Sequence, residues 1–200
     1  TSGLSPDKSN PAMVAFWPTW DNTTQNICYS LDHGRNWKFY DKNPVLVHGE
    51  RDPKVFWHEP TKSWVMVLYD HECYRIFTSK NLLNWDDRQS EIPDSHECPD
   101  MFPLPLDGDK SKMKWVVVRG NGKYSVGDFD GVKFTGETPQ VPCDSGPNFY
   151  AAQTWENMGT GDGRRIQIAW MQNYSGGYPN MPFNQQMTFP RELTLRSTTA

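Results

Sequence analysis

The chain has 200 residues, with 20 basic and 24 acidic side chains and a net charge of −4. The charges are mixed along the chain and no basic block can neutralise phosphates, which argues against nucleic acid as a partner. No apolar stretch reaches the roughly 20 residues that cross a bilayer as a helix. Aromatic residues are abundant, with 9 Trp, 8 Tyr and 10 Phe. They suit either a β-rich core or a surface that stacks on sugar rings.

Short apolar clusters, each bounded by Gly, Pro, Asn or Asp, recur along the chain. In chain order they lie at residues 13–17, 45–47, 55–57, 64–69, 115–118 and 166–170. Such clusters are typical of many short strands. No window shows the spacing of an amphipathic helix. The sequence therefore predicts an all-β fold.

The clusters also recur in a fixed order, which indicates an internal repeat. Pro53 and Pro99 open two successive passes and lie 46 residues apart, and Trp64 and Trp115 within them lie 51 apart. A third pass begins at Tyr150, and a partial pass precedes the first. A repeat of this length with about four strands per unit predicts a β-propeller in which each repeat forms one blade.

The number of repeats bears on how much of a propeller the chain contains. A propeller closes on itself, because an open one exposes sheet edges and the apolar faces between blades. The passes amount to about three and a half units by this repeat pattern, which do not obviously close a ring. We therefore expect residues 1–200 to form one partial β-propeller domain within a longer polypeptide.

The repeat brings two carboxylates, Asp52 and Glu97, to nearly the same position, one residue apart in register. Arg51 and Asp52 precede Pro53 in one pass. Glu97 and Cys98 occupy the same place in the next pass. The innermost strand of each blade starts at one mouth of the channel, so these side chains are expected to converge. Two carboxylates beside an arginine and aromatic rings are typical of glycoside cleavage, although buried Arg–Asp pairs also serve as structural brackets.

Two other chemistries compete for residues 96–98 (HEC) and for their earlier copy at 71–73. Neighbouring residues of a strand point to opposite faces, so three in a row cannot readily surround one metal ion. Cys98 as a nucleophile is disfavoured because the adjacent Glu97 opposes thiolate formation. The copy at 71–73 follows a strand and is expected to be a solvated turn.

Several motifs, in order along essentially the whole chain, resemble those of glycoside hydrolase family 32, the β-fructosidases. Residues 51–57 (RDPKVFW) resemble the RDP motif of that family, and residues 97–100 (ECPD) resemble its EC motif. Residues 149–154, 168–171 and 181–193 resemble its later signatures. Jointly these motifs are highly specific.

The resemblance implies a five-bladed β-propeller followed by a β-sandwich, of which this chain would cover roughly three to four blades and none of the sandwich. It implies a glycoside hydrolase that releases fructose from β-fructosides (sucrose, levan or inulin) by a retaining mechanism. It implies no metal or organic cofactor, no membrane partner and a fructose-containing oligosaccharide or polysaccharide as substrate. The implied site consists of Glu97 as general acid/base, Asp52 as transition-state stabiliser, and Arg51, Cys98, Tyr150 and Trp170 as substrate-binding residues.

The chain departs from the family pattern in one motif. The family nucleophile is the Asp of an N-terminal W-x-N-D-P-N-G motif, and no NDPN occurs in these 200 residues. Asp7 and Asp21 have no matching context. We therefore expect an internal piece that is inactive alone, with a missing N-terminal segment as a partner. Fructose release by the pure chain, abolished by Glu97→Gln, would contradict this expectation.

Two alternatives stay open at this point. One is a non-catalytic fructan-binding propeller, or an inactive fragment that lacks the nucleophile. The other is a related five-bladed glycosidase that acts on arabinans, against which residues 184–193 (NQQMTFPREL) argue. The compartment is not determined by the sequence, and a secreted or periplasmic location is favoured over a cytoplasmic one.

Overall fold

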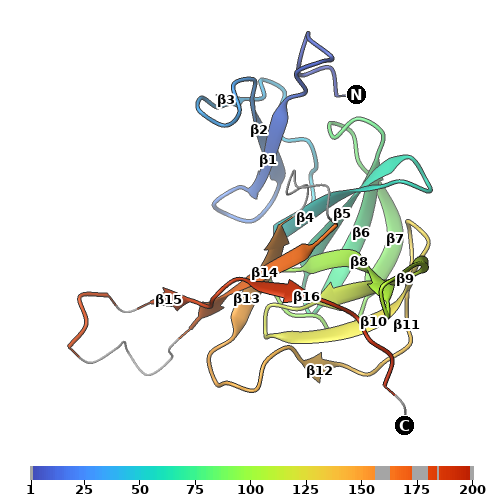
Figure 1. Cartoon of the computed structure of the whole chain (residues 1–200). Helices are drawn as coiled ribbons and strands as arrows, with labels where there is room; N and C mark the ends of the chain where they lie inside the picture. Colours follow the sequence, from blue (N-terminus) through green and yellow to red (C-terminus); the bar gives the residue numbers. More distant parts are fainter. Residues whose placement is uncertain (1, 156–162, 173–179, 184, 199–200) are drawn as a thin grey trace. The chain divides into compact units, whose positions relative to one another are not determined.

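The computed structural model describes residues 2–155, 163–172, 180–183 and 185–198. The chain divides into two compact units: Thr1–Ser95 with Asp130–Phe134, and His96–Phe129 with Thr135–Ala200. We call them unit 1 and unit 2. Every regular element in the described ranges is a β-strand (Figure 1), so the all-β prediction is confirmed. Within these ranges no helix is long and apolar enough to cross a membrane.

Unit 1 contains two antiparallel sheets, each with its strands in chain order (Figure 1). The three-stranded sheet consists of β1 (Met13–Pro18), β2 (Gln25–Ser30) and β3 (Lys38–Phe39). The four-stranded sheet consists of β4 (Arg51–His58), β5 (Ser63–Asp70), β6 (Cys73–Ser79) and β7 (Asp86–Ile92).

Strand β5 supplies the centre of the unit 1 core. Four consecutive side chains, Val65, Met66, Val67 and Leu68, are fully buried, although neighbours in a strand point to opposite faces. Both faces of β5 are therefore covered, which explains its unbroken apolar run rather than an alternating one. Phe16, Leu46, Val55 and Trp85 pack against the cluster of Met66, Leu68 and Phe77.

Unit 2 also contains two antiparallel sheets (Figure 1). In the first, β8 (Asp100–Leu106), β9 (Asp109–Val118), β10 (Lys123–Phe129) and β11 (Phe134–Gly136) follow in order, and β12 (Val141–Pro142) also pairs with β10. In the second, β13 (Tyr150–Trp155) pairs with β14 (Arg165–Met171), which pairs in turn with β15 (Gln186–Met187) and β16 (Arg191–Leu193).

One apolar cluster joins the two sheets of unit 2. The register of β9 with β8 and β10 places the valines of residues 116–118 in the middle of the sheet. The alternation of the pleat sends Val116 and Val118 into the cluster. The other buried members are Phe102, Leu104, Val126, Ala152 and Ala169.

Three of the four sheets begin at or next to a predicted site residue. Strand β4 begins at Arg51, β8 begins two residues after Cys98, and β13 begins at Tyr150. The predicted repeat is thus found as successive antiparallel sheets with the strand pattern of propeller blades. Closure into five blades stays a prediction.

Candidate active site

The predicted site residues are divided between the two units. Arg51 and Asp52 belong to unit 1, and the other predicted residues, Glu97, Cys98, Tyr150 and Trp170, belong to unit 2. All six are half-buried rather than sealed in the core. The convergence of Asp52 with Glu97 stays a prediction, whereas the neighbours of each within its own unit are well defined.

A carboxylate that the sequence interpretation missed holds the guanidinium of Arg51. Glu50 Oε2 accepts a hydrogen bond from Arg51 Nη1, and Glu50 Oε1 lies 3.2 Å from His71 Nδ1. The guanidinium carbon of Arg51 also lies 5.0 Å from the centre of the Tyr69 ring. An anion and an aromatic face together fix where this cation points. The sequence offered one signal for this contact: Glu50 is a charged residue immediately before Arg51 and Asp52 of the RDP motif.

The backbone of this segment is unusual. Glu50 has φ = 73° and Asp52 has φ = 62°, in the left-handed region that side chains other than glycine seldom adopt. The pairing of β4 with β5 also shifts register between Arg51 and Lys54, and such a bulge re-aims side chains at the start of a strand. Each such residue costs about 1–3 kcal/mol and persists only where its surroundings enforce it.

In unit 2, Glu97 lies within a cluster of aromatic side chains. The Tyr150 hydroxyl donates a hydrogen bond to Glu97 Oε2 and lies 3.4 Å from His96 Nδ1. The rings of Tyr150 and Trp170 meet edge to face, with centroids 5.9 Å apart. Three of the predicted site residues are thus brought together. His96 is a fourth member that the sequence interpretation did not select.

Gly120 fixes the backbone beneath Glu97. Its N–H donates to the carbonyl oxygens of His96, at 2.7 Å, and Glu97, at 2.9 Å. Its own carbonyl accepts a 2.8 Å hydrogen bond from the Ala151 N–H. A Cβ added at Gly120 would lie 2.8 Å from the Glu97 carbonyl oxygen, so only glycine permits this approach. Gly120 thereby connects the Glu97 segment to the start of β13.

The residues after Glu97 are also tied to β13. The side-chain amide of Gln153 donates to the carbonyls of Pro99, at 3.1 Å, and Cys98, at 3.4 Å. Asp100 is fully buried, and its carboxylate accepts a 2.6 Å hydrogen bond from the Thr154 N–H. These hydrogen bonds attach the residues that follow Glu97 to strand β13 of the neighbouring sheet.

A hollow of about 190 Å³ adjoins Tyr150. One lining group, the side-chain carbonyl oxygen of Gln172, is buried and accepts no hydrogen bond from the part of the chain that the structure describes. A hydroxyl of a bound molecule could donate to it. The lining residues are His96, Asn121, Pro147, Phe149, Tyr150 and Gln172.

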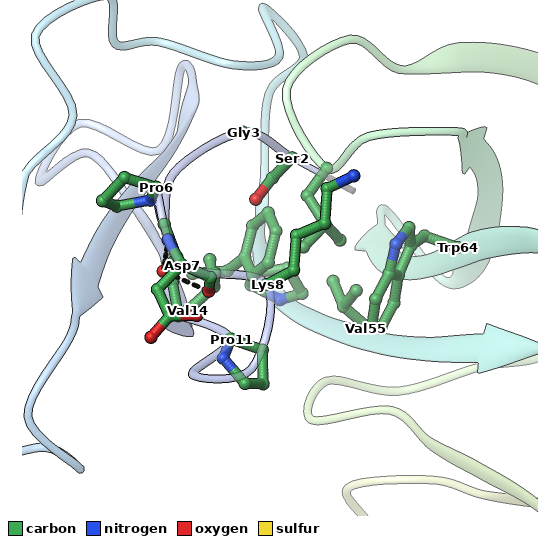
Figure 2. A pocket seen from close by; sticks show the side chains of 14 residues that line it. Ser2, Gly3, Pro6, Asp7, Lys8, Pro11, Val14, Val55 and Trp64 are labelled. Atoms are coloured by element: carbon green, nitrogen blue, oxygen red, sulfur yellow. Dashed lines mark hydrogen bonds between the residues drawn. The ribbon is translucent and has the colours of Figure 1, made fainter.

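A larger hollow of about 630 Å³ lies in unit 1, lined by residues of the segment 2–16 and by four residues further along the chain, Pro53, Val55, Trp64 and Leu82. Figure 2 shows the N-terminal segment, with Ser2 and Lys8, facing Val55 and Trp64. The residues that line it include neither Asp52 nor Glu97, and they include no arginine. Size alone therefore does not make it the candidate for glycoside chemistry.

No group of three or more His, Cys, Asp or Glu side chains is arranged to hold a metal ion in the described ranges. The two HEC tripeptides differ as their contexts predicted. His71 and Glu72 are exposed, both with positive φ, at the turn between β5 and β6. Glu97 is half-buried and bonded to Tyr150. The two copies therefore differ in burial and in hydrogen bonding, and the catalytic role of Glu97 stays a prediction.

Comparison with known proteins agrees with these motifs. Residues 6–200 match the model of the glycosyl hydrolases family 32 N-terminal domain. The chain is 40% identical to a levanase of Bacillus subtilis, with 100% of this chain and 33% of the relative aligned. It is 32% identical to an extracellular exo-inulinase of Aspergillus niger, with 98% and 46% aligned.

A solved structure gives the same result for the fold. The β-fructofuranosidase of Schwanniomyces occidentalis, complexed with fructosyl-erythritol, superposes with a TM-score of 0.83 at 30% identity. The superposition covers 99% of this chain and 43% of that one. The chain thus spans between a third and a half of the length of these relatives. The family model, the levanase relative and the motifs around Asp52 and Glu97 together establish that the chain belongs to glycosyl hydrolase family 32.

Proposed function

We propose that these 200 residues are the acid-bearing part of a β-fructosidase that releases fructose from sucrose, levan or inulin. The observation that carries the proposal is the contact of Glu97 with the Tyr150 hydroxyl, next to Trp170. A carboxyl group held by a hydroxyl donor and flanked by aromatic rings suits a sugar pocket. Relatives named levanase and exo-inulinase support fructans as the substrate class.

In the proposed reaction, Glu97 protonates the glycosidic oxygen as the bond to the anomeric carbon breaks. A nucleophilic carboxylate from outside residues 1–200 attacks that carbon and forms a covalent fructosyl intermediate. Glu97, now ionised, removes a proton from water, and the water releases fructose with net retention. The acid thus becomes the base for the second step.

Asp52 and Arg51 would act on the fructose ring rather than on the leaving group. Positive charge develops on the ring in the transition state. Asp52 would accept hydrogen bonds from ring hydroxyls that strengthen as this charge grows, because charged hydrogen bonds are the strong ones. Arg51, held by Glu50 and the Tyr69 ring, would fix the orientation of the sugar. Cys98 would be a pocket neighbour of Glu97.

The remainder of the family architecture belongs to the same proposal. The nucleophile blade would lie N-terminal to these residues, a fifth blade would close the propeller, and a β-sandwich would follow. A secreted or periplasmic location suits an enzyme that meets polymeric fructans, and one relative is named as extracellular. Because the relatives are named as levanase, exo-inulinase and invertase, the preferred substrate among sucrose, levan and inulin must be measured.

The test compares variants of the full-length protein that contains this chain. Glu97→Gln removes the proton and is expected to lower kcat on sucrose, levan and inulin by about 10²–10⁴-fold, the usual contribution of general acid–base catalysis. Glu72→Gln, in the exposed copy of the same tripeptide, is the matched control and should leave kcat unchanged. Fructose release is the readout.

An activated fructoside separates the role of Glu97 from general damage. A nitrophenolate leaving group needs little protonation, so the Glu97→Gln variant should still form the fructosyl intermediate. Added azide, which needs no base, should then restore turnover and yield fructosyl azide. Full activity in Glu97→Gln would refute the acid assignment. Fructan binding without turnover by the unmodified full-length protein would favour the non-catalytic alternative.

A further inference from the structure

Gln25, the first residue of β2, is a polar side chain with no solvent exposure at all. Its backbone groups are already bonded to the segment after β3. The Gln25 N–H donates to the Leu46 carbonyl at 2.8 Å, and the Gln25 carbonyl accepts from the Val45 N–H at 3.0 Å. Burying a primary amide is unfavourable unless it makes hydrogen bonds of its own. The side chain therefore needs a separate explanation.

The amide acts as a donor to the backbone just before the RDP motif. Gln25 Nε2 lies 2.8 Å from the Glu50 carbonyl oxygen and 3.4 Å from that of His48. The other end of the amide, Oε1, is buried and accepts no hydrogen bond from the described residues. Only the donor half of this buried group is used, and both of its acceptors lie within three residues of Arg51.

The segment held by Gln25 is the strained one. Glu50 and Asp52 both have positive φ, and the Glu50 N–H donates to the Asn22 carbonyl at 2.7 Å. Glu50 is thus fixed through its N–H by Asn22 and through its carbonyl by Gln25. Its carboxylate in turn holds the Arg51 guanidinium. A left-handed conformation at such residues requires this kind of enforcement.

We propose that Gln25 is a positioning residue: its hydrogen bonds hold the backbone of Arg51 and Asp52 in the conformation from which their side chains bind the fructose ring. The inference rests on the proposed function, in which Asp52 stabilises the transition state. Stability alone does not account for the amide. An apolar side chain of similar volume would fill the same space without the unbonded Oε1, so the amide is explained only by the donor bonds that it makes to His48 and Glu50.

The principal variant is Gln25→Met in the full-length protein. Methionine keeps the length and volume, removes both donor bonds and also removes the unbonded acceptor. We expect the melting temperature to fall by several degrees, because the Glu50 and His48 carbonyl oxygens lose this donor, with the variant still folded at the assay temperature. We expect kcat to fall by about 10–100-fold with KM little changed, because a shift of the order of 1 Å in a catalytic group costs about that much.

Ile27→Val is the matched control. Ile27 lies two residues further along β2 and is fully buried, and its backbone N–H and carbonyl bond to Asn43 and Tyr40 rather than to residues 48–52. The smaller side chain should lower the melting temperature by a few degrees, because Ile27→Val removes one buried methyl group. It should leave kcat unchanged below the melting transition. A loss of kcat in Ile27→Val equal to that in Gln25→Met would refute a specific role for the amide.

Gln25→Glu provides a pH-dependent readout that a merely structural role would not produce. A buried carboxyl group has a raised pKa, and its neutral form retains one O–H that can donate to Glu50 or His48. Its ionised form faces two carbonyl oxygens and repels them. The ratio of variant to wild-type kcat should therefore rise as the pH falls. A ratio that does not change with pH would count against the proposal, and this variant decides the question if Gln25→Met does not fold.

Asp52→Asn, measured in parallel, separates the two levels of inference. If Asp52→Asn is inactive and Gln25→Met has wild-type kcat, the positioning role of Gln25 is wrong while the proposed function stands. If Asp52→Asn keeps full activity, the proposed function of Asp52 is wrong, and the role of Gln25 is wrong with it. Loss of kcat in both, with normal folding, is the expected result.

Discussion

Tyr150 combines two functions that can be separated by removing one atom. Its hydroxyl donates to Glu97 Oε2, while its ring packs edge to face against Trp170. In the proposed site, the hydroxyl would orient the carboxyl group and the ring would shape the sugar pocket. The proposed mechanism needs both, because Glu97 must first face the leaving oxygen and later a water molecule.

Tyr150→Phe in the full-length protein should lower kcat by about 10–100-fold, since a hydrogen bond to a charged group contributes about 1.5–3 kcal/mol. The ring contact with Trp170 is retained, so the melting temperature should change little. Tyr124→Phe, in the unit 2 core, is the matched control with normal kcat. An unchanged kcat in Tyr150→Phe would show that the hydroxyl does not orient Glu97.

Gly120 allows a separate test of the Glu97 backbone. An added Cβ would lie 2.8 Å from the carbonyl oxygen of Glu97 and 3.0 Å from that of His96, and both contacts are with backbone that cannot rotate away. Gly120→Ala should therefore move Glu97. We expect kcat to fall by about 100-fold, the cost of misplacing a catalytic group by about 1 Å. Wild-type kcat in a folded Gly120→Ala protein would contradict this geometry.

At the scale of the elements, the same substitution should have a different result in β10. Gly127 packs so closely against β11 that an added Cβ would lie 2.1 Å from the Thr135 carbonyl oxygen. Glycine in a strand interior often marks such a close approach of two backbones. The position affects the pairing of β10 with β11, and β10 carries none of the predicted site residues.

Gly127→Ala should lower the unfolding free energy by about 1–3 kcal/mol, the usual cost of overpacking. Measured well below its melting transition, the folded variant should keep the wild-type kcat. Thermal unfolding and initial rates on the same preparations give both quantities. The paired result expected is loss of stability without loss of kcat in Gly127→Ala, and loss of kcat together with some stability in Gly120→Ala. Equal effects of the two variants on kcat would refute the distinction.

At the scale of the whole molecule, the strands and their order could be predicted because local pattern determines them. The apolar run at 64–69 is β5, buried on both faces. The spacing of Pro53 and Pro99 placed Asp52 and Glu97 one residue apart in the register of the repeat, because one strand pattern is used twice.

The supporting residues could not be predicted from pattern, because their roles depend on backbone conformation and on contacts distant in sequence. Gln25 reaches a carbonyl 25 residues away, and Gly120 touches Glu97 across a loop. Glu50 could be noticed as a charge next to Arg51, yet its positive φ was not visible. Propensity and periodicity report on neighbours in the chain, whereas these contacts form only when the sheets are assembled.

A buried thiol in each unit predicts that the protein loses stability as the pH becomes alkaline. Burial raises the pKa of Cys143 to about 12, with the nearby Asp144 carboxylate adding to the effect. Burial, and then Glu91, raises the pKa of Cys73 to about 11. A thiol of the unfolded chain ionises near its ordinary pKa of 9.0. The contribution to stability is therefore complete below about pH 9 and is lost as the pH rises from there through about 11 and 12.

We expect the unfolding free energy to fall above about pH 9, by at most about 1.4 kcal/mol per pH unit for the Cys143 thiol and by less for the Cys73 thiol, which solvent screens more. Cys143→Ala should flatten this alkaline decline, because the ionisable group in the unit 2 core is gone. Chemical denaturation at a series of pH values between about 8 and 10.5 measures both slopes. Tyrosine and lysine titrations are common to the two proteins and cancel in the comparison. Identical slopes would mean that Cys143 ionises as readily in the folded protein as in the unfolded chain.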